Sequence, residues 1–319
     1  MPADPSTPPI AARRVLLTGA TGFVGSHLAH RLLDHGVPVR AIVRRAGADV
    51  SLLRPGYEEV VGDFVEPAVS ARAAEGCDLV LHAAATSGPE FEPVRRVNVD
   101  GTRSLLDAAR AAGASRFIQI STLSVYDVGG LDEVDEDSPL KTGTEPYGVT
   151  KAEGDRLVFG AAADGLAATI LRPGAILGVH PTSTWAVKVP ARIREGQIKL
   201  LRDGGNTMPF VHVRDLVDAV FLAVASPRSV GRAYNVLEMN GTWRMYTDEV
   251  RGWFGLPELE RVPDAEAAAM TYWTGRFSAK RLRSELGWSP KCRFEQGMAE
   301  SKTFWASSGS GAAPPGAGQ

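Results

Sequence analysis

The feature that most constrains the fold of this chain is a set of three glycines between a predicted strand and a predicted helix. The segment VLLTGATGFVGSHLAHRLLDHG, residues 15–36, places Gly19, Gly22 and Gly25 at that junction. Gly19 allows a tight turn, Gly22 lets the backbone approach a pyrophosphate, and Gly25 lets the helix pack close to the strand. The free N–H groups at the helix N-terminus favour a phosphate there. The spacing is GxxGxxG rather than GxGxxG, and a tight turn without a ligand is the alternative interpretation.

Short apolar segments alternate with amphipathic ones up to about Pro173, which indicates strands alternating with helices. We therefore predict an α/β fold: a doubly wound Rossmann-type parallel sheet with helices on both faces. After Pro173 the rhythm changes, which predicts a smaller, discontinuous substrate-binding lobe over the carboxyl edge of the sheet. The expected boundaries are a disordered arm at 1–12, a dinucleotide-binding domain at 13–176 and 211–236, the lobe at 177–210 and 237–305, and a disordered tail at 306–319.

Charge and cysteine content exclude several classes of protein. The formal net charge of -2 comes without a basic stripe, so we expect no nucleic-acid partner. Cys77 and Cys292 lack metal-ligand spacing, which predicts reduced thiols in a cytoplasmic protein rather than a disulfide framework or a zinc site. Apolar runs are far shorter than the roughly 20 residues of a membrane span, and the N-terminus does not resemble a signal peptide. We expect no membrane partner.

The end of the second predicted strand indicates which dinucleotide binds. In NAD-binding sheets of this kind an acidic residue near this point holds the ribose 2′-hydroxyl. Here the strand ends in AIVRR, so Arg44 and Arg45 stand where the acid is expected. A guanidinium suits a 2′-phosphate, which favours NADP(H) over NAD(H). A solvated pair of surface arginines is the alternative. Asp63, in VVGDF, is placed to meet the adenine amine.

Tyr147 and Lys151, in EPYGVTKAEGDRL, are four residues apart and lie on one face of a predicted helix. A tyrosine has an ordinary pKa of about 10, and a neighbouring lysine cation lowers it. A tyrosine tuned in this way can exchange a proton with a carbinol oxygen while a hydride moves. An ordinary surface pair is the alternative for YxxxK taken alone. The strand FIQIST ends nearby in small hydroxyl residues that can hold a substrate oxygen.

With these motifs the chain resembles the extended short-chain dehydrogenase/reductases, the NAD(P)-dependent epimerase/dehydratase family. The resemblance covers about residues 14–302 and rests on TGATGFVG, GDF, HAAA, NVDGT, STLSVYD, YGVTK, LRPGAILG, FVHVRDLVDA, YNV and LGWSP, in the family's order. It implies a catalytic Thr122, four residues before Tyr126, with Ser121 as a near rival. It also implies that Asn98 orders a proton-relay water.

The resemblance further implies a set of cofactor-binding positions along the motifs. They are Gly19, Thr21, Gly22, Phe23, Val24, Gly25, Arg44, Arg45, Asp63, Phe64, Ala83, Ala84, Ala85, Tyr147, Lys151, Pro173, Gly174 and Ile176. Candidate substrate contacts are Thr86, Ser124 and Met208.

Two departures from the family pattern narrow the activity. The family's 4,6-dehydratases carry an acidic pair where this chain has Leu123 and Ser124, which argues against dehydration. Nucleotide-sugar members usually have an arginine where this chain has Met208, and a methionine cannot pair with phosphate. Other arginines could serve instead, namely Arg202, Arg214 or Arg228.

Three remaining features have structural interpretations. His212 is expected to brace the lobe on the sheet, and His82 to be buried and hydrogen-bonded. The acidic run DEVDED at 132–137 is expected to be a solvated loop, and we predict no metal site.

The sequence thus predicts an NADP(H)-dependent oxidoreductase of a secondary alcohol or ketone, acting on a small molecule as a homodimer. NAD(H) remains a possible cofactor. A nucleotide-sugar epimerase with tightly held NAD(P) is the first alternative, and a non-catalytic dinucleotide-binding regulator is the second.

Overall fold

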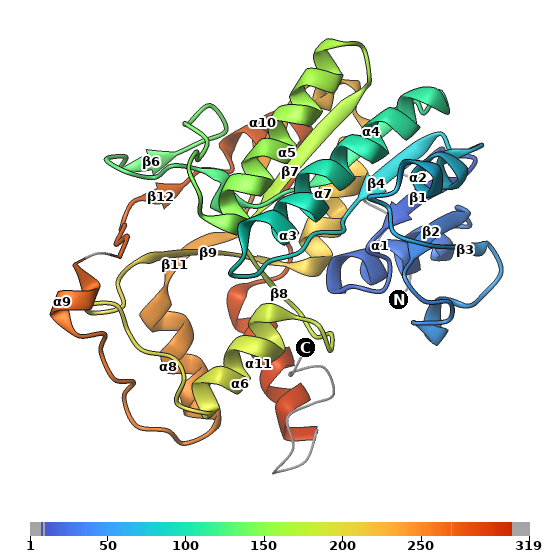
Figure 1. Ribbon diagram of the computed structural model, residues 1–319. Helices are drawn as coiled ribbons and strands as arrows, with labels where there is room; N and C mark the ends of the chain where they lie inside the picture. Colours follow the sequence, from blue (N-terminus) through green and yellow to red (C-terminus); the bar gives the residue numbers. More distant parts are fainter. Residues whose placement is uncertain (1–7, 9, 269, 308–319) are drawn as a thin grey trace.

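A parallel sheet of seven strands forms the centre of the protein (Figure 1). The computed structural model describes residues 8, 10–268 and 270–307. The strand order is β10-β7-β5-β4-β1-β2-β3, and all neighbouring pairs are parallel. The strands are β1 (Val15–Thr18), β2 (Val39–Val43), β3 (Tyr57–Val61), β4 (Leu79–His82), β5 (Arg116–Ile120), β7 (Ala168–Pro173) and β10 (Ala233–Val236).

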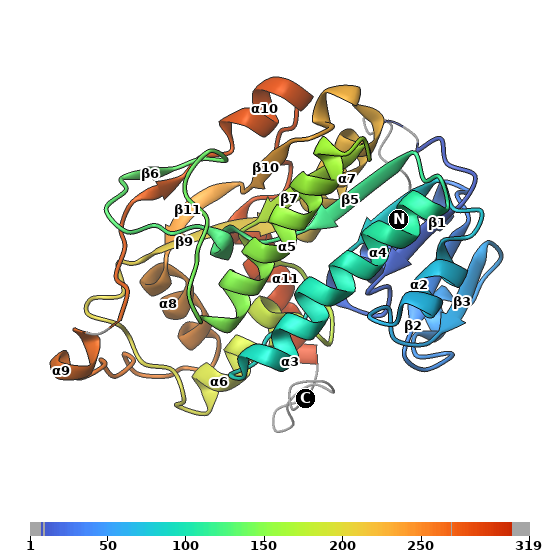
Figure 2. The same ribbon diagram turned by 45° about the horizontal axis from the view of Figure 1, so that its top comes forward.

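Helices cover both faces of this sheet (Figures 1 and 2). One face packs against α1 (Phe23–Asp34), α7 (Val213–Ala225) and α10 (Lys280–Leu286), and the other against α2 (Pro67–Ala74), α4 (Gly101–Ala111) and α5 (Pro146–Ala163). Along β1, Leu17 belongs to the first apolar cluster and Leu16 to the second. Such a strand is apolar throughout because successive side chains enter opposite layers of the core. The arrangement confirms the predicted doubly wound Rossmann-type fold.

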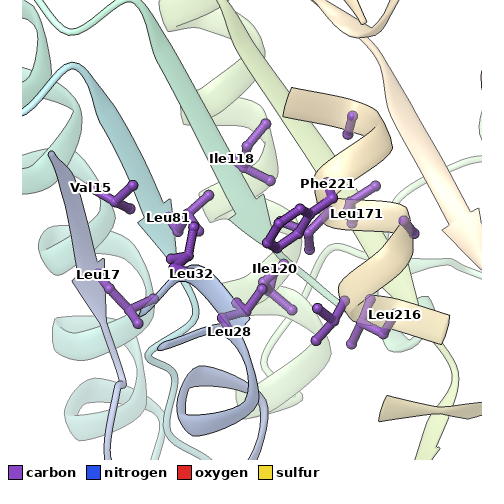
Figure 3. Packing of buried hydrophobic residues seen from close by; sticks show 14 of the residues in the cluster. Val15, Leu17, Leu28, Leu32, Leu81, Ile118, Ile120, Leu171, Leu216 and Phe221 are labelled. Carbon is purple, nitrogen blue, oxygen red and sulfur yellow. The ribbon is translucent and has the colours of Figure 1, made fainter. Parts of the chain in front are cut away.

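The first apolar cluster holds α1 and α7 against the sheet. Figure 3 shows Leu28 and Leu32 of α1, and Leu216 and Phe221 of α7, directed toward the side chains of the strands, among them Leu81, Ile118 and Ile120. Burying a side chain of this size contributes about 1.5–3 kcal/mol. The apolar face of α1 therefore sets how the helix that follows the glycines sits under the sheet.

The order of the strands creates a crevice at one edge. β1 lies between β2 and β4. The chain passes from β1 to β2 and β3 on one side, and then crosses to β4 on the other side of β1. Loops that leave the carboxyl ends of such strands diverge, and ligands bind between them. Because the sheet is parallel, the loops after β1, β4, β5 and β7 all begin at this carboxyl edge.

A second group of elements packs together beyond β7. A three-stranded sheet in the order β11-β9-β8 joins β8 (Ala175–Leu177), β9 (Thr207–His212) and β11 (Met239–Thr242). With α6 (Val189–Arg194), α8 (Trp243–Trp253) and α11 (Phe294–Ser307) it encloses an apolar cluster that includes Phe210, Tyr246 and Phe294. Figure 1 shows these elements together below the main sheet. We call this group the lobe.

Short elements complete the described chain. They are α3 (Phe91–Arg95), α9 (Asp264–Ala267), the paired strands β6 (Glu133–Val134) and β12 (Arg276–Phe277), the 3₁₀ turns η1 (Val50–Leu52), η3 (Leu123–Val125) and η5 (Pro227–Ser229), and the π-helical turns η2 (Arg96–Asp100) and η4 (Thr184–Lys188).

Three boundaries differ from those expected. Ile10, in the expected arm, is only 5% exposed and packs in the same cluster as Val15. Helix α11 extends to Ser307, and Leu282 and Leu286 of α10 pack on the main sheet rather than in the lobe. For Ile10 and α10 an apolar contact decides the position, and composition did not reveal it. The expected arm and tail otherwise fall largely outside the described residues, and the two-domain division stays a prediction.

The turn between β1 and α1 requires two glycines for steric reasons. Gly19 has a φ of +73°, which favours glycine, and a Cβ there would lie 2.8 Å from the backbone N of Ala84. A Cβ on Gly25 would lie 1.9 Å from the carbonyl oxygen of Gly19. Both contacts are with backbone atoms, which cannot rotate away. The close approach of the helix to the strand therefore depends on these two residues.

We expect Gly25→Ala to destabilise the protein by about 3 kcal/mol, the upper end for an overpacked site, because its methyl group meets a carbonyl oxygen. Gly160 in α5 is the matched control, since a Cβ there meets nothing within 4 Å. Gly160→Ala should stabilise the protein by about 0.5–1 kcal/mol through helix propensity. Urea denaturation of both variants measures the two effects. Wild-type stability in Gly25→Ala would contradict the steric argument.

Candidate active site

The N-terminus of α1 is open to an anion. Gly22 is the N-cap of the helix and supplies no side-chain hydrogen bond to the first turn. The amide of Gly22 donates to the carbonyl of Gly19 at 2.9 Å, which closes the turn. The first-turn N–H groups, with the positive end of the helix dipole, are then left for a ligand. This turn contains Thr21, Phe23 and Val24. Its free N–H groups fit the pyrophosphate of a dinucleotide.

A series of buried hydrogen bonds supports the turn between β1 and α1. The Thr102 hydroxyl donates to the carbonyl of Asn98 at 2.7 Å, so it must accept from His82 Nε2 at 3.1 Å. His82 Nδ1 then accepts from the Thr18 hydroxyl at 2.7 Å, and Thr18 Oγ1 accepts the amide of Ala84 at 3.2 Å. Burial lowers the pKa of His82 to about 3, so it stays neutral. His82 is structural, as the sequence predicted.

Asn98 ties the loop after β4 to α5. Its Oδ1 accepts the amide of Thr86 at 2.9 Å, and its Nδ2 donates to the carbonyl of Thr86 at 2.9 Å and to Thr150 Oγ1 at 3.0 Å. The side chain is buried in the π-helical turn η2. Asn98 therefore positions the Ala83, Ala84 and Ala85 segment next to the helix of Tyr147 and Lys151. Its proposed part in ordering a water stays a prediction.

The residues expected at the adenine end surround the ends of β2 and β3. Arg44 and Arg45 follow β2 directly and are exposed. Asp63 Oδ1 accepts the amide of Val65 at 3.1 Å, and its Oδ2 lies 3.2 Å from a guanidinium nitrogen of Arg96. Phe64 packs on Gly101, where a Cβ would lie 2.4 Å from its ring. These residues share the carboxyl edge with the glycine turn.

Helix α5 presents the two residues of the YxxxK motif. Glu145 caps the helix, accepting the amides of Tyr147 at 3.0 Å and Gly148 at 2.9 Å, and Pro146 begins the first turn. The side chain of Tyr147 lies close to the side chain of Thr122, which follows β5, and this contact opposes a rise in the pKa of Tyr147. Lys151 Nζ donates to the carbonyl of Ile120, the last residue of β5, at 2.8 Å. The structure thus brings Thr122, Tyr147 and Lys151 together at the end of β5.

Burial has opposite effects on the two proton-carrying groups. It lowers the pKa of the Lys151 ammonium to about 8, while the nearby carboxylate of Asp155 acts in the other direction. Burial raises the pKa of Tyr147, and the contact with Thr122 opposes that rise. The net direction for Tyr147 is opposite to the lowering expected from the lysine alone, because desolvation of the phenolate is the larger effect.

Ser121 lies beside Thr122 but does not share its contacts. Its hydroxyl oxygen is buried and has no hydrogen-bond partner among the described residues. Thr122 is the residue that reaches Tyr147, and its Oγ1 also accepts the amide of Ser124 at 3.1 Å. An orphaned hydroxyl at the carboxyl edge is consistent with a polar ligand there.

The remaining predicted positions lie on the lobe side of the edge. Pro173 ends β7, and Gly174 lies so close to β9 that a Cβ would meet the carbonyl oxygen of Pro209 at 2.4 Å. Ile176 pairs with Val211 in the lobe sheet. Met208 is half-buried against the lobe cluster, whereas Ser124 is exposed.

His212 braces the lobe, as predicted. Its Nδ1 accepts the amide of Arg214 and caps α7, while its Nε2 lies 3.0 Å from Glu300 Oε2 on α11. Arg214 also binds Glu300. Through Glu300, His212 and Arg214 join the main-sheet helix α7 to the lobe helix α11.

The acidic run at 132–137 is not simply solvated, which corrects the sequence-based expectation. Glu133 pairs with Arg276, but Glu136 is buried, and its Oε1 accepts the amide of Asn235 at 2.9 Å. Arg281 lies 3.7 Å from the other carboxylate oxygen of Glu136. Pairing with a distant strand and helix explains the burial, and local composition carries no sign of it.

A buried ion pair beneath the site was also missed. Arg172 of β7 donates from Nε to Asp155 Oδ2 at 2.8 Å, and Gln119 of β5 donates to Asp155 Oδ1 at 2.9 Å. The Arg172 guanidinium also reaches the hydroxyl of Tyr126 at 2.6 Å. The sequence held a partial signal, because Asp155 continues the four-residue spacing of Tyr147 and Lys151.

Two further observations concern metals and membranes. Within the described ranges, no group of three or more histidine, cysteine, aspartate or glutamate side chains could hold a metal ion. None of the helices in the part of the chain that the structure describes has the length and apolar character needed to cross a membrane.

Comparison with known proteins identifies the family. Residues 15–236, more than half of the chain, match the NAD dependent epimerase/dehydratase family. A ketoreductase from Stigmatella aurantiaca, named for 4-hydroxy-2-methyl-3-oxo-4-farnesyl-3,4-dihydroquinoline-1-oxide, is 31% identical over 66% of this chain and 64% of its own length. The match thus spans somewhat less than two thirds of that relative.

Two other proteins match over most of their length. A 3-beta-hydroxysteroid dehydrogenase from Mycolicibacterium neoaurum is 28% identical, over 92% of this chain and 91% of its own. A double mutant of the dTDP-glucose 4,6-dehydratase DesIV from Streptomyces venezuelae, solved with NAD and DAU bound, has a TM-score of 0.78 at 26% identity, over 92% of this chain and 97% of its own. The chain therefore belongs to the NAD dependent epimerase/dehydratase family, the extended short-chain dehydrogenase/reductases.

Proposed function

We propose that this enzyme transfers a hydride between NADP(H) and a secondary alcohol or ketone that carries a hydrophobic body. The observation that carries the proposal is the contact of Thr122 with Tyr147 beside the buried Lys151. These three side chains meet at the same carboxyl edge of the sheet as the uncapped N-terminus of α1. A bound nicotinamide would supply the hydride, and the protein supplies the proton.

Each of the three residues has a distinct role in the proposed reaction. In the reducing direction Tyr147 gives its hydroxyl proton to the substrate oxygen. Thr122 donates a hydrogen bond to the same substrate oxygen. This oxygen then lies between the hydroxyls of Thr122 and Tyr147 and replaces their direct contact. The Lys151 cation favours the negative charge that the proton leaves on the Tyr147 oxygen. The oxidising direction runs through the same contacts in reverse.

The preference for NADP(H) rests on the two arginines after β2. Neither Arg44 nor Arg45 forms an ion pair within the described chain, and both side chains are exposed at the carboxyl edge. A 2′-phosphate would give them an anionic partner, whereas a ribose 2′-hydroxyl would not. Asp63 is already engaged by Arg96, so it does not offset their charge.

A hydrophobic substrate is supported by the side chains of the lobe. Trp185 and Trp243 are half-buried, and their rings pack edge to face with centroids 6.1 Å apart. Met208 lies in the same cluster, at the position where nucleotide-sugar enzymes have an arginine. The names of two relatives point the same way, since one acts on a farnesylated dihydroquinoline oxide and the other on a 3β-hydroxysteroid.

The arginines that could replace the missing phosphate contact have other positions. The Arg202 guanidinium stacks 4.6 Å from the ring centre of Tyr272. Arg214 binds Glu300. Arg228 lies in η5, just before β10 and therefore at the amino edge of the sheet. Leaving two phosphate charges without cationic partners in a cleft would be costly, which disfavours a sugar nucleotide.

Two alternatives remain. A UDP-glucose 4-epimerase from Azospirillum brasilense, 28% identical to this chain, makes a nucleotide-sugar epimerase with tightly held NAD(P) the second candidate. A non-catalytic dinucleotide-binding regulator is less consistent with the assembled Thr122, Tyr147 and Lys151.

Tyr147→Phe removes the proton donor and keeps the ring, so we expect turnover of a ketone to fall by about 100-fold or more while the cofactor still binds. Lys151→Ala should impair both the turnover of the ketone and the binding of the cofactor. Tyr57→Phe is the control, because the Tyr57 hydroxyl lies on β3 and has no hydrogen-bond partner among the described residues. Steady-state kinetics and cofactor fluorescence measure the effects. Near-normal turnover in Tyr147→Phe would overturn the proposed role of Tyr147, and cofactor binding by a wild type that turns over no ketone would favour the regulator.

Arg44→Asp should move cofactor preference from NADP(H) toward NAD(H), because it places an acid where the ribose 2′-hydroxyl would bind. Arg228→Asp makes the same charge change at the opposite edge of the sheet and should leave the preference unchanged. Fluorescence titration of each protein with both reduced cofactors gives the ratio of dissociation constants. Tighter binding of NAD(H) by the wild type would overturn the proposed preference.

Substrate class is tested by calorimetry in the presence of NADP⁺, which prevents turnover of a ketone. A ketone with a hydrophobic body should bind more tightly than UDP or TDP, because the lobe offers apolar surface and no phosphate-binding arginine at position 208. Micromolar binding of either nucleoside diphosphate would raise the epimerase to first place.

A further inference from the structure

Three polar side chains lie along one face of α5. Tyr147, Lys151 and Asp155 are four residues apart, so they stack on successive turns of the helix. Tyr147 is the outermost of the three, at the first turn. Lys151 is only 2% exposed, and Asp155 is fully buried. The row therefore runs from the mouth of the site into the core.

The carboxylate of Asp155 is held from two neighbouring strands. Arg172 of β7 and Gln119 of β5 each donate to one of its oxygens, at 2.8 and 2.9 Å. The side chains of Arg172 and Asp155 are 1% and 0% exposed. Charge-assisted hydrogen bonds of this kind fix the carboxylate in place. The same contacts fix the position of α5 along β5 and β7.

Lys151 depends on that carboxylate for its charge. Among the groups around it, His82 of β4 is neutral, Tyr147 is protonated, and Arg172 of β7 is itself a cation. Burial lowers the pKa of Lys151 to about 8, and Asp155 is the charged group that raises it. Asp155 also raises the pKa of Tyr147, as does Glu145 at the helix N-cap.

We propose that Asp155 is a positioning residue of the active site, whose clamped carboxylate keeps Lys151 protonated and holds the Tyr147 helix in register with β5 and β7. It touches neither cofactor nor substrate and acts through its neighbours on α5. The proposal rests on the proposed function for its consequence in catalysis. The effect on Lys151 is independent of any substrate.

The test is a titration of Lys151 by NMR in protein labelled with ¹³C at the lysine ε-carbons. The chain has seven lysines, and Lys151→Ala identifies the signal of interest. In Asp155→Asn we expect the Lys151 titration to move by about one pH unit toward acid, as for loss of a neighbouring opposite charge. Glu136→Gln is the matched control, because it removes another buried carboxylate of the same region that does not act on Lys151. It should leave the titration unchanged.

Asp155→Asn leaves Arg172 without its buried partner and can prevent folding. The double variant Asp155→Asn/Arg172→Met removes both charges, and it should still show an acid shift of Lys151, smaller than in the single variant because loss of the Arg172 cation acts in the opposite direction. In whichever variant folds, the alkaline limb of kcat/KM for ketone reduction should also move to lower pH, because both Lys151 and Tyr147 then lose their protons sooner. An acid shift of the Lys151 titration supports the proposal even if the protein turns over no ketone. The absence of ketone turnover would reject only the proposed function. An unchanged Lys151 titration in a folded variant overturns it.

Discussion

The ion pair between Asp155 and Arg172 joins α5, the helix that carries Tyr147 and Lys151, to the sheet. Both side chains are removed from water, and loss of one partner from such a pair typically costs about 3–5 kcal/mol. Arg172 also contacts the hydroxyl of Tyr126, which donates to Asn235 of β10 at 2.7 Å. One interaction thus connects α5 with β7, with the segment after β5, and with the edge strand of the sheet. The positions of Tyr147 and Lys151 follow from this connection.

A second polar network, without a charge, supports the dinucleotide side. It runs from Thr18 at the end of β1 through His82 and Thr102 to Asn98, whose side chain binds both Thr86 and Thr150. The glycine turn and α5 are therefore held by one set of buried hydrogen bonds. Burial keeps His82 neutral, and this network holds one tautomer of it in place. The glycine turn and the Thr122–Tyr147 contact both lie at the carboxyl edge of the sheet.

Much of the fold and part of the site could be predicted from local patterns. Alternating strands and helices gave the parallel sheet, and in such a sheet Gly19, Thr122 and Pro173 must share one edge. The buried roles of His82 and His212 were also expected. Among the features that were not expected are the burial of Glu136 and the core contacts of Ile10. Each depends on elements far away in the sequence, namely Asn235 for Glu136 and the cluster around β1 for Ile10.

The sequence by itself determined the periodicity of the helices and strands and the position of the tight glycine turn. It also determined the spacing that puts Tyr147 and Lys151 on one helical face. These are local properties, because they follow from the geometry of consecutive residues. Only the tertiary structure decided that burial raises the pKa of Tyr147, that Asp155 pairs with Arg172, and that Thr122 rather than Ser121 contacts the tyrosine. Charge state and pairing depend on how much water is excluded and on which distant groups are nearby, and the packing of β5, β7 and α5 sets both.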